Sequence, residues 1–158
     1  MAITPNPNER IKTILVVEDD ATIRYILRVV LERMGHAVLE GCDGTDGLNV
    51  ARNFNHRIDF SISDVRMPKM DGPEMVSRIQ AERPSIKVLF MSTYSMQSLP
   101  PDRTEDFLPK PILPAAIEKK VQEVFARDPA SLARGNWRHR YDRILEVARV
   151  SRPRSRRG

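Results

Sequence analysis

The sequence places three consecutive carboxylates at the end of an apolar run. Ile14-Leu15-Val16-Val17 is followed directly by Glu18-Asp19-Asp20. Four apolar, largely β-branched residues are typical of a buried strand, whereas adjacent carboxylates repel one another unless water or a metal ion lies between them. This boundary is therefore a candidate Mg²⁺ site, because Mg²⁺ prefers oxygen ligands. A solvated strand end followed by a helix cap is the alternative interpretation.

Other apolar runs also end in polar residues. These residues are Asp64 after the run 58–63, Ser92 and Thr93 after the run 86–91, and Lys110 after the run 106–109. Carboxylates that hold Mg²⁺, a carboxylate that attacks phosphorus, and a hydroxyl and an ammonium group that meet the phosphoryl oxygens are the parts of a phosphoryl-transfer site. If the runs are parallel strands, these residues lie together at the carboxyl ends of the strands. The sequence then predicts a phosphoryl-transfer site there.

The elements that would position these residues alternate between strands and helices. Strands are predicted at 12–17, 37–40, 58–63, 86–91 and 106–109. Apolar residues at helical spacing from Ile23 to Met34, closed by Gly35, predict a helix between the first two strands, and a last helix is predicted from Leu113 to Phe125. This alternation predicts an α/β fold, with a doubly wound parallel sheet that binds ligands at the carboxyl ends of its strands.

Two acidic residues are predicted to begin helices. Asp20 is better explained as the cap of the first helix than as a metal ligand. In Asp71-Gly72-Pro73-Glu74, Asp71 is the predicted cap, Pro73 lies in the first turn, and Glu74 is positioned to reach back to the cap.

Composition limits the class of protein. The chain has 158 residues, of which 41% are hydrophobic and 30% charged, as expected for a soluble globular domain with a tail. Its apolar runs are too short to span a membrane and its start does not resemble a signal peptide, so a cytoplasmic protein without membrane contact is expected. The single cysteine, Cys42, excludes an internal disulfide.

The basic character of the chain belongs to its last segment. Residues 128–158 hold nine arginines against three acidic residues, a balance of +6, whereas residues 1–127 total −1. This shift predicts a disordered segment at 1–11, a domain at 12–127, and a basic C-terminal helix and tail at 128–158. An amphipathic helix in the tail would have one apolar face, formed by Trp137, Tyr141, Ile144, Leu145 and Ala148. It could pack on the domain or on a second protomer, or its arginines could bind nucleic acid.

Four motifs resemble the receiver domain of two-component response regulators, in the CheY-like superfamily. They are Val16-Val17-Glu18-Asp19-Asp20, Ser63-Asp64-Val65-Arg66-Met67-Pro68-Lys69-Met70-Asp71-Gly72, Val88-Leu89-Phe90-Met91-Ser92-Thr93 and Phe107-Leu108-Pro109-Lys110-Pro111. The resemblance covers residues 12–127 and implies a flavodoxin-like five-stranded sheet of order 2-1-3-4-5. It also implies a non-enzymatic signalling domain that promotes its own phosphorylation and dephosphorylation only.

The resemblance assigns roles to individual residues. Asp64 is the implied phosphoacceptor, and Glu18, Asp19, Asp64 and the backbone carbonyl of Arg66 are the implied Mg²⁺ ligands. Lys110, expected to precede a cis peptide bond to Pro111, pairs with Asp64 and then with the phosphoryl oxygens.

Three further positions are implied to govern switching and phosphate lifetime. Ser92 would move toward the phosphoryl group and let Phe107 turn inward, although a strand phenylalanine can equally be plain core. Arg66 and Tyr94 stand where the family tunes phosphate lifetime, and both are bulky enough to shield the phosphoryl group from water.

The chain departs from the family between its fourth and fifth strands. Only seventeen residues separate Ser92 from Lys110, and they include Pro100-Pro101. The fourth helix is therefore expected to be shortened or missing, because proline disfavours a helix interior. Similar short connections occur in receivers attached to hybrid histidine kinases.

The expected function is a phosphorylation-controlled switch of a two-component or phosphorelay system. A histidine kinase or phosphotransfer protein would phosphorylate it, and it would act through protein contact, with a homodimer as one arrangement. A DNA-binding or transcription-associated regulator that uses the basic tail, and an inactive receiver-like scaffold, are the competing classes.

Overall fold

The computed structural model describes residues 10–93 and 107–126, which belong to one compact unit ending at Ala126. Strands and helices alternate along it in this order: β1 (Thr13–Val17), α1 (Ala21–Arg33), β2 (Ala37–Gly41), α2 (Gly44–Asn53), β3 (Phe60–Asp64), α3 (Gly72–Glu82), β4 (Lys87–Ser92), β5 (Phe107–Pro109) and α4 (Pro114–Ala126). The strands form one parallel sheet of order β2-β1-β3-β4-β5. The predicted sheet is therefore confirmed.

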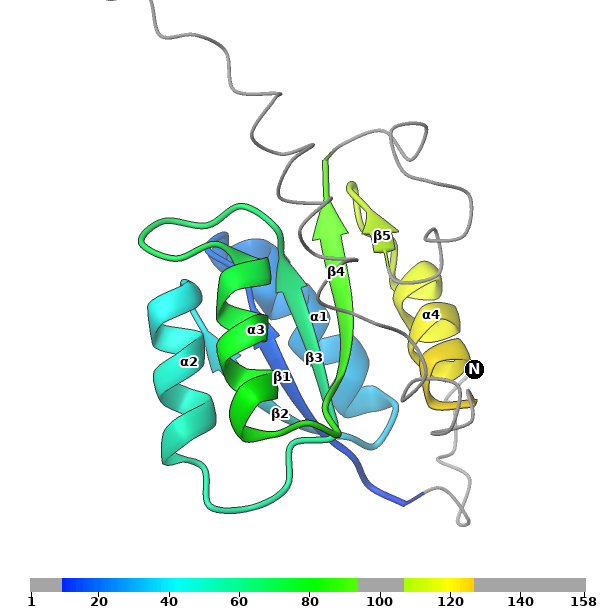
Figure 1. The fold of residues 1–158 in the computed structure, drawn as a ribbon. Coiled ribbons are helices and arrows are strands. Elements are labelled where there is room, and N and C mark those ends of the chain that lie inside the picture. Colours follow the sequence, from blue (N-terminus) through cyan, green and yellow to red (C-terminus); the bar gives the residue numbers. More distant parts are fainter. Residues whose placement is uncertain (1–9, 94–106, 127–158) are drawn as a thin grey trace, which may run out of the picture. The chain divides into compact units, whose positions relative to one another are not determined.

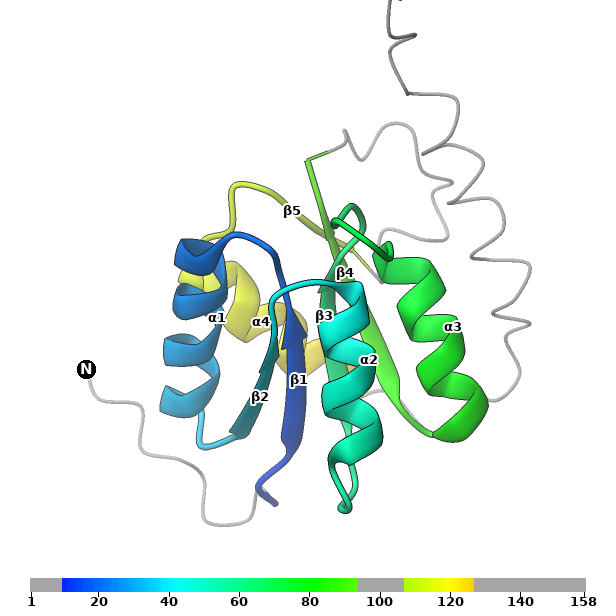
Figure 2. The ribbon, with the colours of Figure 1, turned by 90° about the vertical axis from the view of Figure 1, so that its left-hand side faces the viewer.

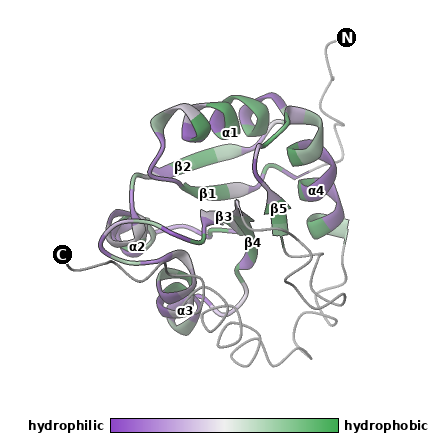
Figure 3. Ribbon diagram, turned by 90° about the horizontal axis from the view of Figure 1, so that it is seen from above, coloured by the Kyte–Doolittle hydropathy of each residue, from purple (hydrophilic) through white to green (hydrophobic). Residues whose placement is uncertain are grey.

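Two layers of helices cover the sheet. Helices α1 and α4 pack together on one face, and α2 and α3 pack together on the other (Figures 1 and 2). The view from above shows the strands between the two pairs, with hydrophobic and hydrophilic positions alternating along α1 (Figure 3). This sandwich explains why the central strands are apolar on both faces.

Strand β1 shows how alternate residues serve the two layers. Ile14 and Val16 belong to the core cluster beneath α1 and α4, together with Leu27 and Ile117. Val17 lies on the opposite face, with its methyl groups next to Gly47 of α2. All four apolar residues of β1 are fully buried, as the sequence predicts.

Local signals at helix ends are largely confirmed. The Asp20 side chain accepts hydrogen bonds from the backbone N–H groups of Thr22 and Ile23, and the Asp71 side chain accepts one from Glu74. Gly35 follows α1 with a φ of 89°, a conformation that glycine adopts readily. The Glu74 carboxylate does not reach back to the cap as predicted, because it pairs with Arg78 at 2.6 Å.

Several elements differ from the prediction. Helix α2, capped by Asp43, is not predicted from the sequence. Strand β3 begins at Phe60 rather than Ile58. Asp59 lies before the strand, and its carboxylate accepts a hydrogen bond from the backbone N–H of Thr13 at 3.0 Å. Helix α4 begins at Pro114 rather than Leu113; Leu113 is 65% exposed, and its carbonyl accepts the first hydrogen bonds of that helix.

Several predictions fall on residues outside the described ranges. They concern the N-terminal segment, the helix between the fourth and fifth strands, Tyr94, and the basic segment 128–158. Within residues 10–93 and 107–126, no helix is long and apolar enough to cross a membrane.

Candidate functional site

The register of the sheet brings the ends of four strands together. Val17 is paired with Ser63 across β1 and β3, Asp64 with Met91, and Ser92 with Pro109. The residues at these ends therefore share one edge of the sheet, where ligands bind in doubly wound folds. The backbone N–H of Lys110 donates to the carbonyl of Ser92 at 2.9 Å, which fixes the position of the lysine beside β4.

Lys110 forms ion pairs with two buried carboxylates. Its Nζ atom lies 2.9 Å from Oε2 of Glu18 and 3.2 Å from Oδ2 of Asp64. Glu18 is 0% exposed and Asp64 8% exposed, so each carboxylate has little water around it. The ammonium group therefore provides the charge compensation that a pair of buried carboxylates needs. The peptide bond from Lys110 to Pro111 is cis, as expected.

The three acidic residues predicted to hold a metal lie close together. Carboxylate oxygens of Glu18, Asp19 and Asp64 all lie within 4.8 Å of one another. Opposite ligands of Mg²⁺ are about 4 Å apart, and the ion accepts hard oxygen ligands, so this donor set fits it after small side-chain movements. Asp20 is not part of the cluster, which agrees with its role as a helix cap.

Burial dominates the electrostatics of this site. It raises the pKa of Glu18, since the charged form loses water, although Lys110 and the Asp20 backbone act in the opposite direction. Burial likewise raises the pKa of Asp64 against the influence of Lys110. Burial alone would lower the pKa of Lys110, but Glu18 and Asp64 together raise it. The ammonium group is therefore kept charged by the carboxylates that it compensates.

Helix α3 begins in direct contact with Asp64. The backbone N–H of Gly72 donates to the carbonyl of Val65 at 2.9 Å, which holds the turn after β3 against the start of α3. A Cβ atom at Gly72 would lie 2.1 Å from the carbonyl oxygen of Asp64, so only glycine fits. The Ser63 hydroxyl donates to the same carbonyl at 2.9 Å. Gly72 and Ser63 therefore both lie against the backbone carbonyl of Asp64.

Helix α2 supports the loop between β3 and α3. A Cβ atom at Gly44 would lie 2.1 Å from the carbonyl oxygen of Met70, and Nζ of Lys69 lies 3.3 Å from Oδ2 of Asp43. Lys69 has a positive φ of 69°, which is uncommon outside glycine. The N-terminus of α2 thus restrains the segment that leads from Asp64 to α3.

The remaining predicted residues occupy different environments. Ser92 is 7% exposed at the end of β4. Phe107 is 4% exposed, with its ring centroid 5.8 Å from that of Phe90, which is the position of an ordinary core residue. Arg66 is exposed beside Asp64, and Tyr94 lies outside the described residues.

A sequence profile of the response regulator receiver domain matches residues 14–122, more than half of the chain. The chain belongs to the response regulator receiver family. The matched residues are thus a receiver domain of two-component signalling, a signalling domain rather than a catalytic one.

Relatives and solved structures agree with this membership. The receiver domain is 32% identical over 119 residues to the sensor kinase CckA of Brucella abortus, a match that covers 73% of this chain and 13% of the kinase. It is 34% identical to the solved receiver domain of the hybrid histidine kinase CckA, covering 71% of this chain and 98% of that one, with a TM-score of 0.60. CheY of Borrelia burgdorferi, solved in a complex with CheX, BeF3 and Mg, is 25% identical, with coverages of 78% and 96% and a TM-score of 0.67.

These matches differ in length. The chain spans 51% of the probable transcriptional regulator ycf27 of Cyanidium caldarium and 48% of the response regulator GtcR of Aneurinibacillus migulanus, but nearly the whole of the solved receiver domains. The shared part is therefore the receiver domain itself.

Some residues of this receiver site are not predicted from the sequence. Gly44 and Gly72 are needed for close backbone contacts, and Arg24 of α1 donates to the carbonyl of Glu18 at 2.6 Å. Each glycine directly follows a helix cap, Asp43 for Gly44 and the predicted cap Asp71 for Gly72, and that adjacency is a local signal for them.

Proposed function

We propose that this receiver domain accepts a phosphoryl group on Asp64 in a Mg²⁺-dependent reaction and signals through protein contacts. The observation that supports this most is the position of Lys110, whose ammonium group pairs with both Glu18 and Asp64 next to a cluster suited to a metal ion. The donor is a histidine kinase or phosphotransfer protein, as is general for receivers, or a small phosphodonor such as acetyl phosphate.

In the proposed reaction an Asp64 carboxylate oxygen attacks the phosphorus atom of the donor. The new bond is O–P, and the bond that breaks is N–P in a phosphohistidine or O–P in acetyl phosphate, with the electron pair leaving on nitrogen or oxygen. Glu18, Asp19, Asp64 and the Arg66 carbonyl would hold Mg²⁺, which supplies positive charge for the phosphoryl oxygens. Lys110 would exchange its pairing with the Asp64 carboxylate for one with a phosphoryl oxygen.

Ser92 would transmit the reaction to the rest of the domain. Its hydroxyl, at the end of β4, would bond the phosphoryl group and favour a second arrangement of β4 and β5. Phe107 packs on Phe90 across those two strands, so a shift of Ser92 would alter that contact and change the surface beside β5. A downstream protein, or a second protomer, would recognise the changed surface.

Asp64→Asn tests the proposed phosphoacceptor directly. We expect the wild-type protein to gain one phosphoryl group from acetyl phosphate and Mg²⁺, and the variant to gain none, because an amide is not a nucleophile at neutral pH. Intact-mass spectrometry measures the product, and Asp20→Asn serves as the control because Asp20 lies outside the carboxylate cluster. Phosphorylation of Asp64→Asn to the wild-type level would contradict the proposal, as would a wild type that neither acetyl phosphate nor a cognate kinase phosphorylates.

Magnesium should stabilise the fold through Asp19. An ion bound among Glu18, Asp19 and Asp64 raises the melting temperature, because it binds the folded state only. Asp19→Asn removes one charged ligand while leaving the buried Lys110 pairs in place, so the rise should be largely lost. Thermal unfolding with and without Mg²⁺ measures the effect, and an equal rise in both proteins would exclude Asp19 as a ligand.

Arg66 and Tyr94 are proposed to lengthen the life of the phosphorylated state. Arg66 follows Asp64 by two residues and Tyr94 follows Ser92 by two residues. Both side chains are large enough to exclude attacking water, so Arg66→Ala and Tyr94→Ala should each accelerate dephosphorylation severalfold. The decay of phosphorylated protein after removal of the donor measures the rate. No acceleration in either variant would show that neither side chain shields the group.

A DNA-binding role of the basic segment is the second candidate function. The nine arginines of residues 128–158 favour it, since clustered arginines bind phosphates without sequence preference. Salt-dependent DNA affinity that disappears on deletion of residues 136–158 would support this role over signalling through protein contacts.

A further inference from the structure

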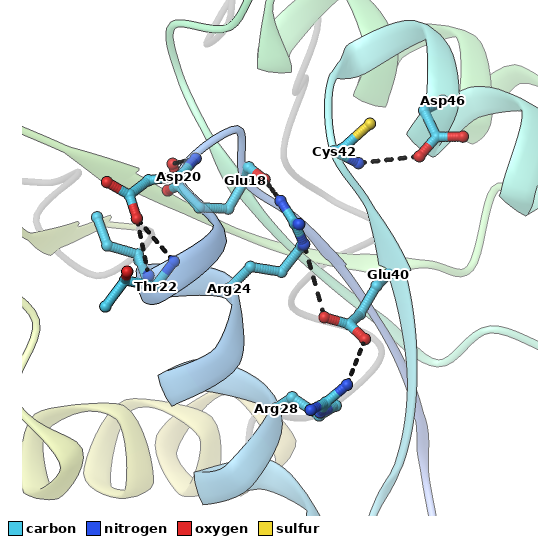
Figure 4. A network of polar contacts seen from close by, with 9 residues as sticks. Glu18, Asp20, Thr22, Arg24, Arg28, Glu40, Cys42 and Asp46 are labelled. Carbon is cyan, nitrogen blue, oxygen red and sulfur yellow. Dashed lines mark hydrogen bonds and ion pairs between the residues drawn. The ribbon is translucent and has the colours of Figure 1, made fainter.

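We propose that Arg24 is a positioning residue for the metal-binding turn after β1. Its Nη1 atom donates to the backbone carbonyl of Glu18 at 2.6 Å, and its Nε atom lies 3.6 Å from Oε1 of Glu40 (Figure 4). The inference rests on the proposed function, because it assigns Arg24 to the Mg²⁺ site of that reaction.

The carbonyl that Arg24 holds is central to the site. It belongs to the peptide that links Glu18 to Asp19, two of the three carboxylates in the cluster. Rotation of that peptide would move Asp19 relative to Glu18. Arg24 prevents such rotation from the side of α1, whereas Asp19 itself is exposed and is not held by burial.

The other contacts of Glu18 involve its side chain and its N–H group, not the carbonyl of the peptide that links it to Asp19. The Glu18 N–H donates to the carbonyl of Gly41 at 3.1 Å, and Oε1 of Glu18 accepts from the Asp20 N–H at 3.1 Å. Lys110 pairs with Oε2. Among the contacts described, Arg24 therefore fixes the one polar atom of Glu18 that faces the link to Asp19.

Glu40 of β2 pairs with two arginines of α1, Arg24 and Arg28. Arg28 therefore serves as a matched comparison for Arg24. Arg28, one helical turn further along α1, pairs with the same carboxylate at 3.1 Å. Arg28 also lies over the ring of Tyr25, with its Cζ atom 5.3 Å from the ring centroid. The two arginines share charge, helix and partner, but in Figure 4 only Arg24 extends to the Glu18 carbonyl.

The direction of the effect separates positioning from simple electrostatics. Arg24 is a positive charge close to a cation site, so removal of its charge alone would tighten Mg²⁺ binding. Loss of a group that orients metal ligands weakens binding, commonly by about 10-fold or more. Arg24→Ala is therefore expected to bind Mg²⁺ about 10-fold more weakly than wild type.

Calorimetric titration of the full chain with MgCl2 tests the proposal, with acetyl phosphate labelling of each protein in parallel. Arg28→Ala should bind Mg²⁺ as tightly as wild type or slightly more tightly. Glu40→Gln should weaken binding less than Arg24→Ala, and adding it to Arg24→Ala should have no further effect, since both changes act through one contact. Arg24→Lys keeps the charge but cannot contact both the Glu18 carbonyl and the Glu40 carboxylate, so it should also bind Mg²⁺ more weakly. It is the variant to use if Arg24→Ala does not fold.

The outcomes distinguish the two proposals. Unchanged or tighter Mg²⁺ binding by Arg24→Ala and Arg24→Lys, with wild type binding Mg²⁺ and becoming phosphorylated, would overturn the role of Arg24 alone. A wild type that binds no Mg²⁺ would overturn the proposed function and the role of Arg24 with it. Equal weakening by Arg28→Ala would show that the effect comes from the Glu40 pairs in general, and would also overturn the proposal.

Discussion

Lys110→Met is expected to lower the free energy of unfolding by about 3 kcal/mol in metal-free buffer at neutral pH, and to abolish phosphorylation. Methionine keeps most of the aliphatic length of lysine and removes the ammonium group. Its loss leaves Glu18 and Asp64 buried, adjacent and without their shared counter-charge. The estimate lies at the low end of the range for broken buried pairs because the Lys110 side chain is 13% exposed.

The loss of folding stability in Lys110→Met should depend on pH. Burial already raises the pKa values of Glu18 and Asp64, and loss of Lys110 removes a lowering influence from both. A carboxyl group with a raised pKa in the folded state favours folding when protonated. That contribution is complete below the ordinary carboxyl pKa and is lost as the pH rises through the raised value. The difference between Lys110→Met and wild type in free energy of unfolding should therefore shrink as the pH falls from about 7 to about 5.

Denaturant unfolding at both pH values measures these differences. Lys69→Met is the control, because its pair with Asp43 involves a lysine side chain that is 69% exposed, and about 0.5 kcal/mol is expected. Adding Glu18→Gln to Lys110→Met should recover part of the loss, because one of the two uncompensated charges is then gone. A Lys110→Met protein as stable as wild type at both pH values would show that water already compensates the carboxylates.

The parts of the fold predicted from the sequence have either a short-range signal or a general rule of sheet topology behind them. Strand β1 is predicted because four consecutive apolar residues favour burial on both faces. Asp20 is predicted to cap α1 because a carboxylate just before a helix accepts hydrogen bonds from the free N–H groups of its first turn. The shared edge of Glu18, Asp64, Ser92 and Lys110 is predicted because parallel strands place their carboxyl ends together.

Features that depend on particular long-range packing or side-chain contacts are not predicted. Helix α2 contains Gly44 and Gly47, which lower its intrinsic helix propensity, and it forms because packing against α3 and the sheet outweighs that preference. Arg24 resembles any solvated arginine on a helix surface until the fold brings the Glu18 carbonyl within reach. The last helix is predicted to begin at Leu113, one residue before its observed start at Pro114, because apolar spacing alone cannot show which residue begins the first turn.

Gly72→Ala is expected to lower the free energy of unfolding by about 3 kcal/mol, the upper end for overpacking in a well-packed region. The added Cβ atom would lie 2.1 Å from the carbonyl oxygen of Asp64 and 2.8 Å from Oγ of Ser63. A backbone oxygen cannot rotate away as a flexible side chain can, so either β3 or the start of α3 must move. The gain of about 1 kcal/mol in helix propensity on replacing glycine offsets only part of this loss.

The movement would also affect the proposed reaction. The Gly72 N–H is bonded to the Val65 carbonyl, so displacement of α3 pulls on the turn directly after Asp64. Misplacement of a reacting group by about 1 Å can slow a reaction about 100-fold. We therefore expect Gly72→Ala, where it remains folded, to be phosphorylated by acetyl phosphate between 10- and 100-fold more slowly, in rough proportion to the displacement.

Gly47→Ala provides the comparison because its clashes are of another kind. A Cβ atom there would meet Sδ of Met75 and a methyl group of Val17, each at 2.7 Å, rather than a backbone atom. The flexible methionine can repack, so a loss of about 1 kcal/mol and a nearly unchanged phosphorylation rate are expected. If Gly72→Ala matched Gly47→Ala in both measurements, the turn after β3 would have to be deformable. The acceptor would then owe its position to its side-chain pair with Lys110 rather than to the close packing of α3 against its backbone.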